Sequence, residues 1–151
     1  RGHEPTSPGD AVMRLITDDA IAIITIWQEA RGESYAGKVA VAEVIRNRVT
    51  RKYNCDGTIA GACLRAFQFS GFNTTDPNRV PSFKLDNSNP VVAECAKAWD
   101  QAKNGGDMVC QAVLYLNPRI LKEIPAWVSV CDHVATVGNH DFYRPKRSVE
   151  T

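Results

Sequence analysis

Two glutamates four residues apart, Glu29 and Glu33, follow a strongly apolar segment in the stretch WQEARGESYAGKVAVAEV. A carboxyl group in apolar surroundings has a raised pKa and can hold a proton near neutral pH, as a general acid must. Glu29 stands at the end of the apolar segment and is the candidate for this role. The residues leave two other interpretations open: a surface carboxylate, or a structural ion pair with a cation such as Arg31 or Arg46.

A glycosidase that activates water needs a second carboxylate, roughly 5 Å from the first in retaining enzymes and roughly 6.5–9.5 Å away in inverting enzymes. Glu33 would lie one turn beyond Glu29 if the helix continued, but Gly32 leaves its direction open. Glu43 is a further candidate, although it suits a surface ion pair equally well. The residues alone therefore do not settle which acid is the second one.

Other catalytic chemistries find little support. The histidines are His3, His133 and His140, and none belongs to an HExxH pattern, which disfavours a metallopeptidase. A cysteine peptidase would need an exposed and activated thiol. The chain has neither a Gly-rich phosphate loop nor a GxSxG motif. We expect no metal site and no cofactor.

Five cysteines without a CxxC pair argue against a structural zinc site. In an oxidising compartment we expect two disulfides, Cys55–Cys63 and Cys110–Cys131. Cys95 shares an apolar helical stripe with Val92 and Trp99, so we expect it to be buried and free. The alternative is that all five are reduced core residues of a cytosolic protein.

The length of 151 residues suits one domain with its own core. We expect a flexible tail over residues 1–16, where Gly, Pro and Ser abound, and a single catalytic domain over residues 17–151. The chain begins with Arg1, which indicates a processed or trimmed product. The net charge of +1 gives no reason to expect nucleic acid, and no apolar run approaches a membrane span. A monomer is the default expectation.

The hydrophobic pattern predicts three long helices. Thr17 or Asp18 caps the first, which runs through DDAIAIITIWQEA, stops near Gly32 and is apolar on almost every side. The second covers about residues 37–53, and a short helix near LRAF follows. The third lies between Asn89-Pro90 and Gly105-Gly106. Within the second helix, the run RNRVTRK is interpreted as a solvated face, or alternatively as an attraction for an anionic polymer.

After Gly106 the pattern changes to short apolar runs typical of strands, in QAVLYLN, AWVSV and HVATVGNHDFYR. Turns are predicted at Asn117-Pro118 and Gly138-Asn139. Helices followed by strands favour the α+β class over an alternating sheet. The predicted fold is thus a mainly helical domain with a small antiparallel β element in its C-terminal third.

Several of these segments together resemble the SleB-type cell-wall hydrolases, a family that includes spore-cortex-lytic enzymes and phage-borne peptidoglycan hydrolases. The resemblance rests on WQEARGESYAGKVAVAEVIRNRV, QFSGFN, AVLYLNP, PAW and VATVGNHDFYR in this order, over roughly residues 17–144. It implies a lysozyme-like fold related to lytic transglycosylases. It also implies action on the β-1,4 bond between N-acetylmuramic acid and N-acetylglucosamine of peptidoglycan glycan strands.

The resemblance assigns the catalytic acid to Glu29, the first glutamate of EARGE. Other positions that match the motifs are expected to line or support the site: Glu33, Asn47, Gln68, Ser70, Tyr115, Asn117 and His140. Relatives often carry a histidine just before the tyrosine of the strand motif, where this chain has Leu114. A role for that histidine therefore does not transfer.

The leading hypothesis is a lytic transglycosylase in which Glu29 serves as acid and then as base. A muramidase that uses Glu33 or another second carboxylate is the alternative. A non-catalytic wall-binding or virion module, and a peptidase or amidase that cuts the stem peptide, are retained as hypotheses from other classes. Each of these activities implies a location outside the cytoplasm, whether secreted, periplasmic or virion-associated.

Overall fold

The structure is a computed structural model that describes residues 17–64, 76–77, 79–82, 84–86 and 88–147. The predicted tail of residues 1–16 lies outside the described residues, as do Gln68 and Ser70. The elements follow in the order α2, α3, α4, α5, α6, β1, η2, β2 and β3.

Helix α2 (Asp18–Ala30) is the central helix that the sequence predicts. The Thr17 side chain accepts a hydrogen bond from the backbone N–H of Ala20 at 3.1 Å and caps the helix, as expected. Ala22 and Ile26 are fully buried. The helix ends two residues before Gly32, which places Glu29 in its last turn.

Helix α3 (Tyr35–Arg51) begins two residues earlier than predicted, because the side chain of Ser34 caps it by accepting from Gly37 at 3.2 Å. Every residue of this helix from Gly37 to Ile45 is buried. The interpretation of RNRVTRK as a solvated face is wrong at Arg48, which is only 4% exposed. Arg48 follows Val44 and Ile45 at helical spacing and therefore continues their buried stripe.

The described residues that follow form three further helices: α4 (Ile59–Leu64), α5 (Arg79–Ser82) and α6 (Pro90–Lys103). Helix α4 lies one step earlier along the chain than the short helix expected near LRAF, of which all but Leu64 falls outside the described residues. Asn89 caps α6 by accepting from the N–H of Val91 at 2.9 Å, with Pro90 at the first helical position. This local cap chemistry confirms the predicted start of α6.

The C-terminal third forms a three-stranded antiparallel sheet in the order β1 (Leu114–Leu116), β3 (His140–Pro145) and β2 (Cys131–Val137). Tyr115 lies opposite Phe142 in the β1–β3 register. The turn at Gly138-Asn139 joins β2 to β3, as predicted. The sheet confirms the predicted fold class.

The prediction of a strand in AWVSV is wrong. This segment is the 3-10 helix η2 (Ala126–Val130). Pro125 precedes it and has no N–H for a strand ladder, while its carbonyl accepts from Val128 at 3.1 Å. The Ser129 hydroxyl donates to the Ala126 carbonyl at 3.0 Å. These local hydrogen bonds close a tight turn before β2 begins.

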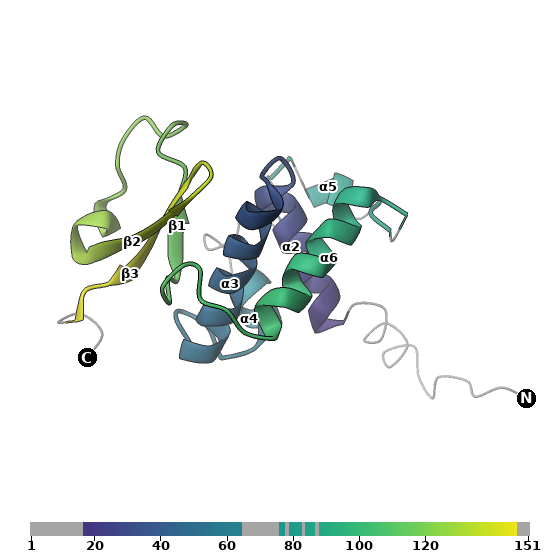
Figure 1. Cartoon of the computed structure of the whole chain (residues 1–151), viewed down its shortest axis with the longest axis horizontal. Helices are drawn as coiled ribbons and strands as arrows, with labels where there is room; N and C mark the ends of the chain where they lie inside the picture. Colours follow the sequence, from purple (N-terminus) through teal and green to yellow (C-terminus); the bar gives the residue numbers. More distant parts are fainter. Residues whose placement is uncertain (1–16, 65–75, 78, 83, 87, 148–151) are drawn as a thin grey trace, which may run out of the picture.

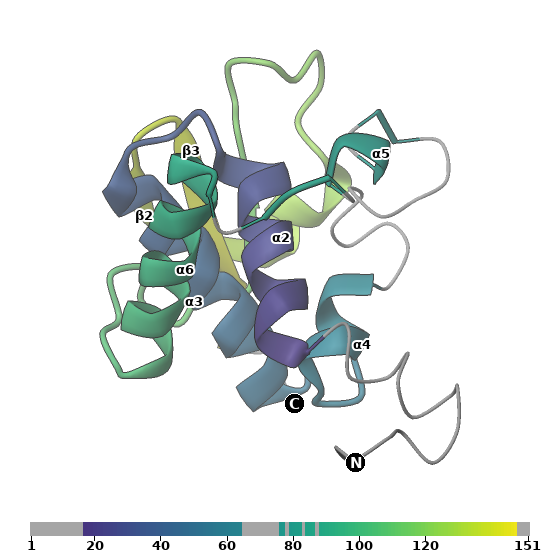
Figure 2. The same ribbon diagram turned by 90° about the vertical axis from the view of Figure 1, so that its right-hand side faces the viewer.

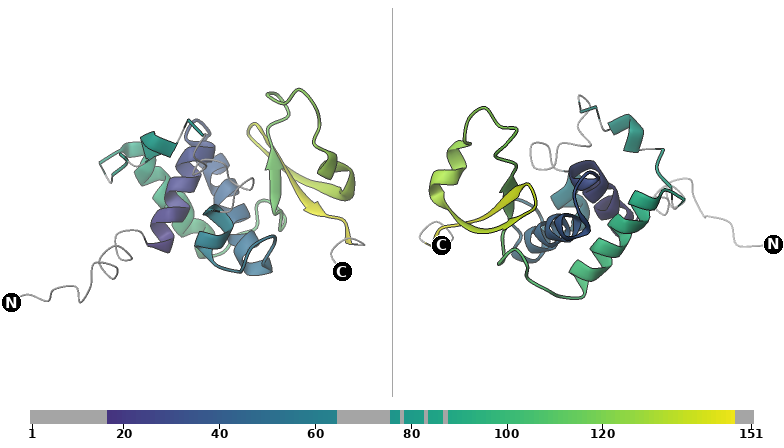
Figure 3. Two further views of the ribbon diagram at one scale, coloured as in Figure 1. Left: turned by 180° about the vertical axis from the view of Figure 1, so that it is seen from behind. Right: turned by 45° about the horizontal axis from the view of Figure 1, so that its top comes forward.

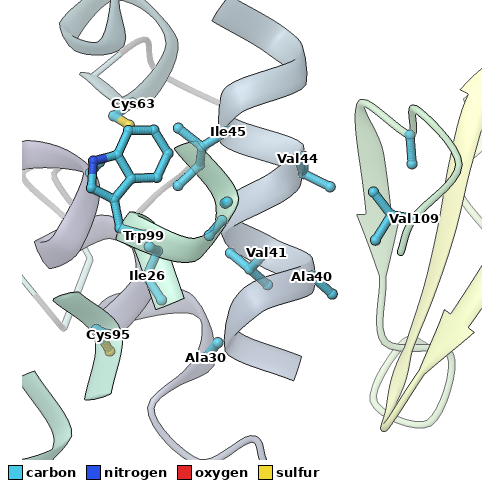
Figure 4. Packing of buried hydrophobic residues seen from close by; sticks show 14 of the residues in the cluster. Ile26, Ala30, Ala40, Val41, Val44, Ile45, Cys63, Cys95, Trp99 and Val109 are labelled. Carbon is cyan, nitrogen blue, oxygen red and sulfur yellow. The ribbon is translucent and has the colours of Figure 1, made fainter. Parts of the chain in front are cut away.

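Figure 1 shows α2, α3 and α6 side by side, with the sheet on the opposite side of α3 from α6. The two views of Figure 3 show the same order. Between the helices, Ile26, Ile45 and Trp99 belong to one buried cluster (Figure 4). None of the helices among the described residues is long and apolar enough to cross a membrane.

The predicted disulfides Cys55–Cys63 and Cys110–Cys131 are wrong for this structure, in which all five cysteines lie among the described residues as free thiols. The Cys55 thiol donates to the carbonyl of Arg48 at 3.4 Å. Cys63 is fully buried in the helical core, and Cys110 is exposed. Cys95 is buried and free, as predicted.

A thiol titration under denaturing, non-reducing conditions is therefore expected to find five thiols. In the native protein Cys110 should react first, whereas Cys63 and Cys95 should stay protected, because burial raises the pKa of each to about 11. A count of one thiol after denaturation would restore both predicted disulfides.

Candidate active site

The carboxyl group of Glu29 lies half-buried at the end of α2, where the hydroxyl of Tyr115 donates a hydrogen bond to its Oε1. Burial raises the pKa of Glu29 above its usual value. The hydrogen bond from Tyr115 and the positive charge of Arg48 oppose this rise, and the negative charge of Asp76 adds to it. Burial thus shifts Glu29 toward its protonated form.

The sheet places Tyr115 beneath this carboxyl group. Tyr115 lies on β1, and its ring meets Phe142 at 5.6 Å between centroids and His140 edge-on at 5.1 Å. Burial, together with the nearby charge of Glu29, raises the pKa of Tyr115 well above its usual value. The hydroxyl therefore keeps its proton and acts as a donor toward Glu29.

Arg48 supplies a buried positive charge on the neighbouring helix. Its Nε donates to the carbonyl of Val113 at 2.6 Å, just before β1. Its charge favours the ionised forms of both Glu29 and Tyr115. The sequence-based list of site residues lacks Arg48, although its place on the stripe of Val44 and Ile45 is a signal that could have revealed it.

Glu33 lies beyond the end of α2, so the carboxyl groups of Glu29 and Glu33 do not share one helical face. Its side chain is 13% exposed and faces the β2–β3 turn. Oε2 accepts from the side-chain amide of Asn139 at 3.2 Å, and Oε1 from its backbone N–H at 3.4 Å. His140 Nδ1 lies 3.8 Å from Oε1. The structure therefore brings Glu33 and His140 together.

Two other predicted residues form structural contacts. Asn47 is 7% exposed, and its amide donates to the Ala112 carbonyl at 2.9 Å while its oxygen accepts from Arg46 at 3.0 Å. The side-chain oxygen of Asn117 accepts from the N–H of Arg119 at 3.0 Å and opens the predicted turn after β1. Both side chains shape segments that flank β1.

Glu43 is buried and does not form the surface ion pair considered from its sequence position. It is 2% exposed, and its Oε1 accepts from the N–H of Val109 at 3.1 Å. Burial raises the pKa of Glu43. Its contact links α3 to the segment that leads into β1, as the contact of Asn47 does.

Among the described residues, Asp76 carries a negative charge that raises the pKa of Glu29. It precedes α5, and Ser82 of α5 accepts a hydrogen bond from the buried amide of Gln28 at 3.0 Å. Within the part of the chain that the structure describes, no group of three His, Cys, Asp or Glu residues could hold a metal ion.

Residues 32–143 match the model of the cell wall hydrolase family, and the chain belongs to that family. The matched range begins after Glu29. The chain is 27% identical over 117 residues to a spore cortex-lytic enzyme of Bacillus cereus. The aligned region covers 78% of this chain and 40% of that enzyme.

Two solved structures share the fold. The catalytic domain of the germination-specific lytic transglycosylase SleB from Bacillus anthracis is 28% identical, with a TM-score of 0.65 over 84% of this chain and 93% of that one. The catalytic domain of the Bacillus cereus SleB protein is 26% identical, with a TM-score of 0.66 over 95% and 98%. The chain spans about 40% or less of the length of the curated relatives it matches.

Tyr115→Phe removes the hydrogen bond that lowers the pKa of Glu29, so this pKa is expected to rise. We expect a loss of about tenfold in the rate on cell walls, the order of one hydrogen bond to a charged group. The alkaline limb of the rate–pH profile should move to higher pH, because Glu29 then keeps its proton longer. Tyr143→Phe, on β3, is the matched control, and an equal shift there would contradict the assignment.

Proposed function

We propose that the protein is a glycosidase that cleaves the β-1,4 bond between N-acetylmuramic acid and N-acetylglucosamine in peptidoglycan glycan strands. The observation that carries this proposal is the position of Glu29, half-buried at the end of α2. Burial raises the pKa of Glu29, and the hydroxyl of Tyr115 donates a hydrogen bond to its Oε1. Membership of the cell wall hydrolase family supports the substrate class. This substrate lies outside the cytoplasm, which is where the protein is proposed to act.

The reaction begins with proton transfer from Glu29 to the glycosidic oxygen as the bond to C1 of the muramic acid breaks. The C6 hydroxyl of the same sugar then attacks C1, and the ionised Glu29 takes the proton of that hydroxyl. The products are a free 4-hydroxyl on one fragment and a 1,6-anhydro ring on the other. Glu29 ends protonated and no water is consumed, which is lytic transglycosylation.

Three observations favour this single-acid route. Both carboxylate oxygens of Glu33 accept hydrogen bonds from Asn139, so Glu33 is engaged with the β2–β3 turn. The Bacillus anthracis relative with the same fold is described as a lytic transglycosylase. Arg48 and Tyr115 both favour ionised Glu29, which eases its change from acid to base.

Hydrolysis by a muramidase mechanism is the second candidate, and one observation favours it. Asp76 is near enough for its charge to raise the pKa of Glu29. A second carboxylate in that position could direct a water molecule at C1, as the two-carboxylate mechanism requires. Asp76 is therefore a candidate for the second acid, along with Glu33.

The test is mass spectrometry of soluble fragments released from purified peptidoglycan. Fragments one water lighter than hydrolysis products, with 1,6-anhydro-muramic acid ends, are the expected result. Reducible muramic acid ends would establish a muramidase instead. New free amino groups without new sugar ends would mean a peptidase or amidase, and tight binding without release would mean a wall-binding module.

A further inference from the structure

We propose that Glu33 is a positioning residue that holds the β2–β3 turn against the α2–α3 turn, so that His140 and Tyr115 keep Glu29 in place. This inference rests on the proposed function, in which Glu29 is the general acid. It assigns to the second glutamate of EARGE a task other than that of a second catalytic carboxylate. Figures 1 and 2 both show the two turns on the same side of the molecule as the end of α2.

The surroundings of Glu33 are built closely around its carboxylate. Gly138 adopts a φ of +57°, and a Cβ on it would lie 2.9 Å from Glu33 Oε1. A Cβ on Gly37 would lie 2.8 Å from the Cβ of Glu33. Both distances are shorter than real Cβ contacts, so the glycines permit this approach. One glycine comes from α3 and the other from the hairpin, which places Glu33 between the two.

The main chain of Glu33 is held as firmly as its side chain. The ammonium group of Lys38 donates to the carbonyl of Glu33 at 2.5 Å and pairs with Glu94 of α6 at 2.7 Å. Lys38 is only 2% exposed. A carboxylate with both oxygens engaged and its backbone fixed is suited to hold another segment in register. It is poorly suited to direct a water molecule.

A short path of contacts leads from Glu33 to the catalytic acid. His140 is 7% exposed, follows Asn139 at the turn, and has its Nδ1 3.8 Å from Glu33 Oε1. Within the described residues this Nδ1 has no hydrogen-bond partner, so the ring is held by packing and by the turn. The ring meets Tyr115 edge-on at an interplanar angle of 84°. Tyr115 in turn donates to Glu29.

The test is a double-mutant cycle of Glu33→Gln and Asn139→Ala, measured as kcat, KM and the rate–pH profile on purified peptidoglycan. Asn139 is exposed at the turn, and its replacement removes only its side-chain contact with Glu33. We expect losses in kcat of about fivefold for Asn139→Ala and about tenfold for Glu33→Gln, with KM little changed. The double variant should resemble Glu33→Gln, because both changes break one link.

The pH profile separates positioning from catalysis. If Glu33 positions Tyr115, both variants keep every limb of the profile. The limb governed by Glu29 then moves to higher pH, because a looser Tyr115 contact lowers the pKa of Glu29 less. If Glu33 is a second catalytic acid, Glu33→Gln should remove one limb of the rate–pH profile and most of the activity. Asn139→Ala should then leave the profile and the activity almost unchanged. That second pattern would overturn the proposal.

Two controls keep the result interpretable. Asp100→Asn makes the same change of acid to amide on the exposed face of α6 and should leave kcat and the profile unchanged. If Glu33→Gln fails to fold, the pH shift of Asn139→Ala alone still decides between the two roles. An active Glu29→Gln variant would remove the proposed function itself, whereas an inactive one with an unshifted Asn139→Ala profile would remove only the positioning role of Glu33.

Discussion

Glu29→Gln is expected to lower the release of soluble fragments from purified peptidoglycan by about a thousandfold, within the range of a general acid. Glutamine keeps the shape of the side chain and an oxygen that can accept from Tyr115, but it has no proton to transfer. Turbidity clearing and fragment analysis measure the loss. Activity close to that of the wild type would rule out Glu29 as the acid.

The same variant is expected to fold at least as well as the wild type at neutral pH. Burial raises the pKa of Glu29 in the folded state, so the folded protein binds more protons than the unfolded chain between the two pKa values. The free energy of unfolding contributed by Glu29 therefore falls as the pH rises through that window. Glutamine removes this dependence on pH. In thermal melts recorded from acid to neutral pH, the Tm of the variant should therefore rise relative to that of the wild type.

The second large effect is expected for Arg48→Met, which should lower the free energy of unfolding by about 3 kcal/mol. Methionine replaces much of the apolar stem, but it leaves the carbonyl of Val113 without its donor at 2.6 Å. It also removes the buried positive charge that favours ionised Glu29. Urea unfolding followed by circular dichroism measures the loss.

Arg51→Met is the matched control for Arg48→Met, because it lies on the same helix, is exposed and donates to the Gln111 carbonyl at 3.2 Å. We expect its effect to stay below about 1 kcal/mol. In active protein, Arg48→Met should also move the alkaline limb of the rate profile to higher pH, since the pKa of Glu29 rises without the cation. Equal stability of the two variants would contradict the structural role of Arg48.

The helices that carry the site were predictable because their signals are local. Thr17 and Asn89 mark helix starts through contacts two or three residues away. The hairpin at Gly138-Asn139 is equally local. By contrast, the apolar residues of AWVSV suit a strand, and the neighbouring Pro125 together with local hydrogen bonds made them a 3-10 helix. Cysteine positions in the sequence likewise carried no information on which thiols approach one another.

The sequence by itself determined the family resemblance, the central helix and the place of Glu29 at its end, because periodicity and capping act within a few residues. Only the tertiary structure decided what surrounds that acid. Tyr115 reaches Glu29 from 86 residues further along the chain, through the register of β1 with β3. Arg48 became a buried charge, and Glu33 turned to the hairpin. Such contacts depend on how the sheet packs against α3. Local sequence patterns act within a few residues and do not specify contacts between segments so far apart in the chain.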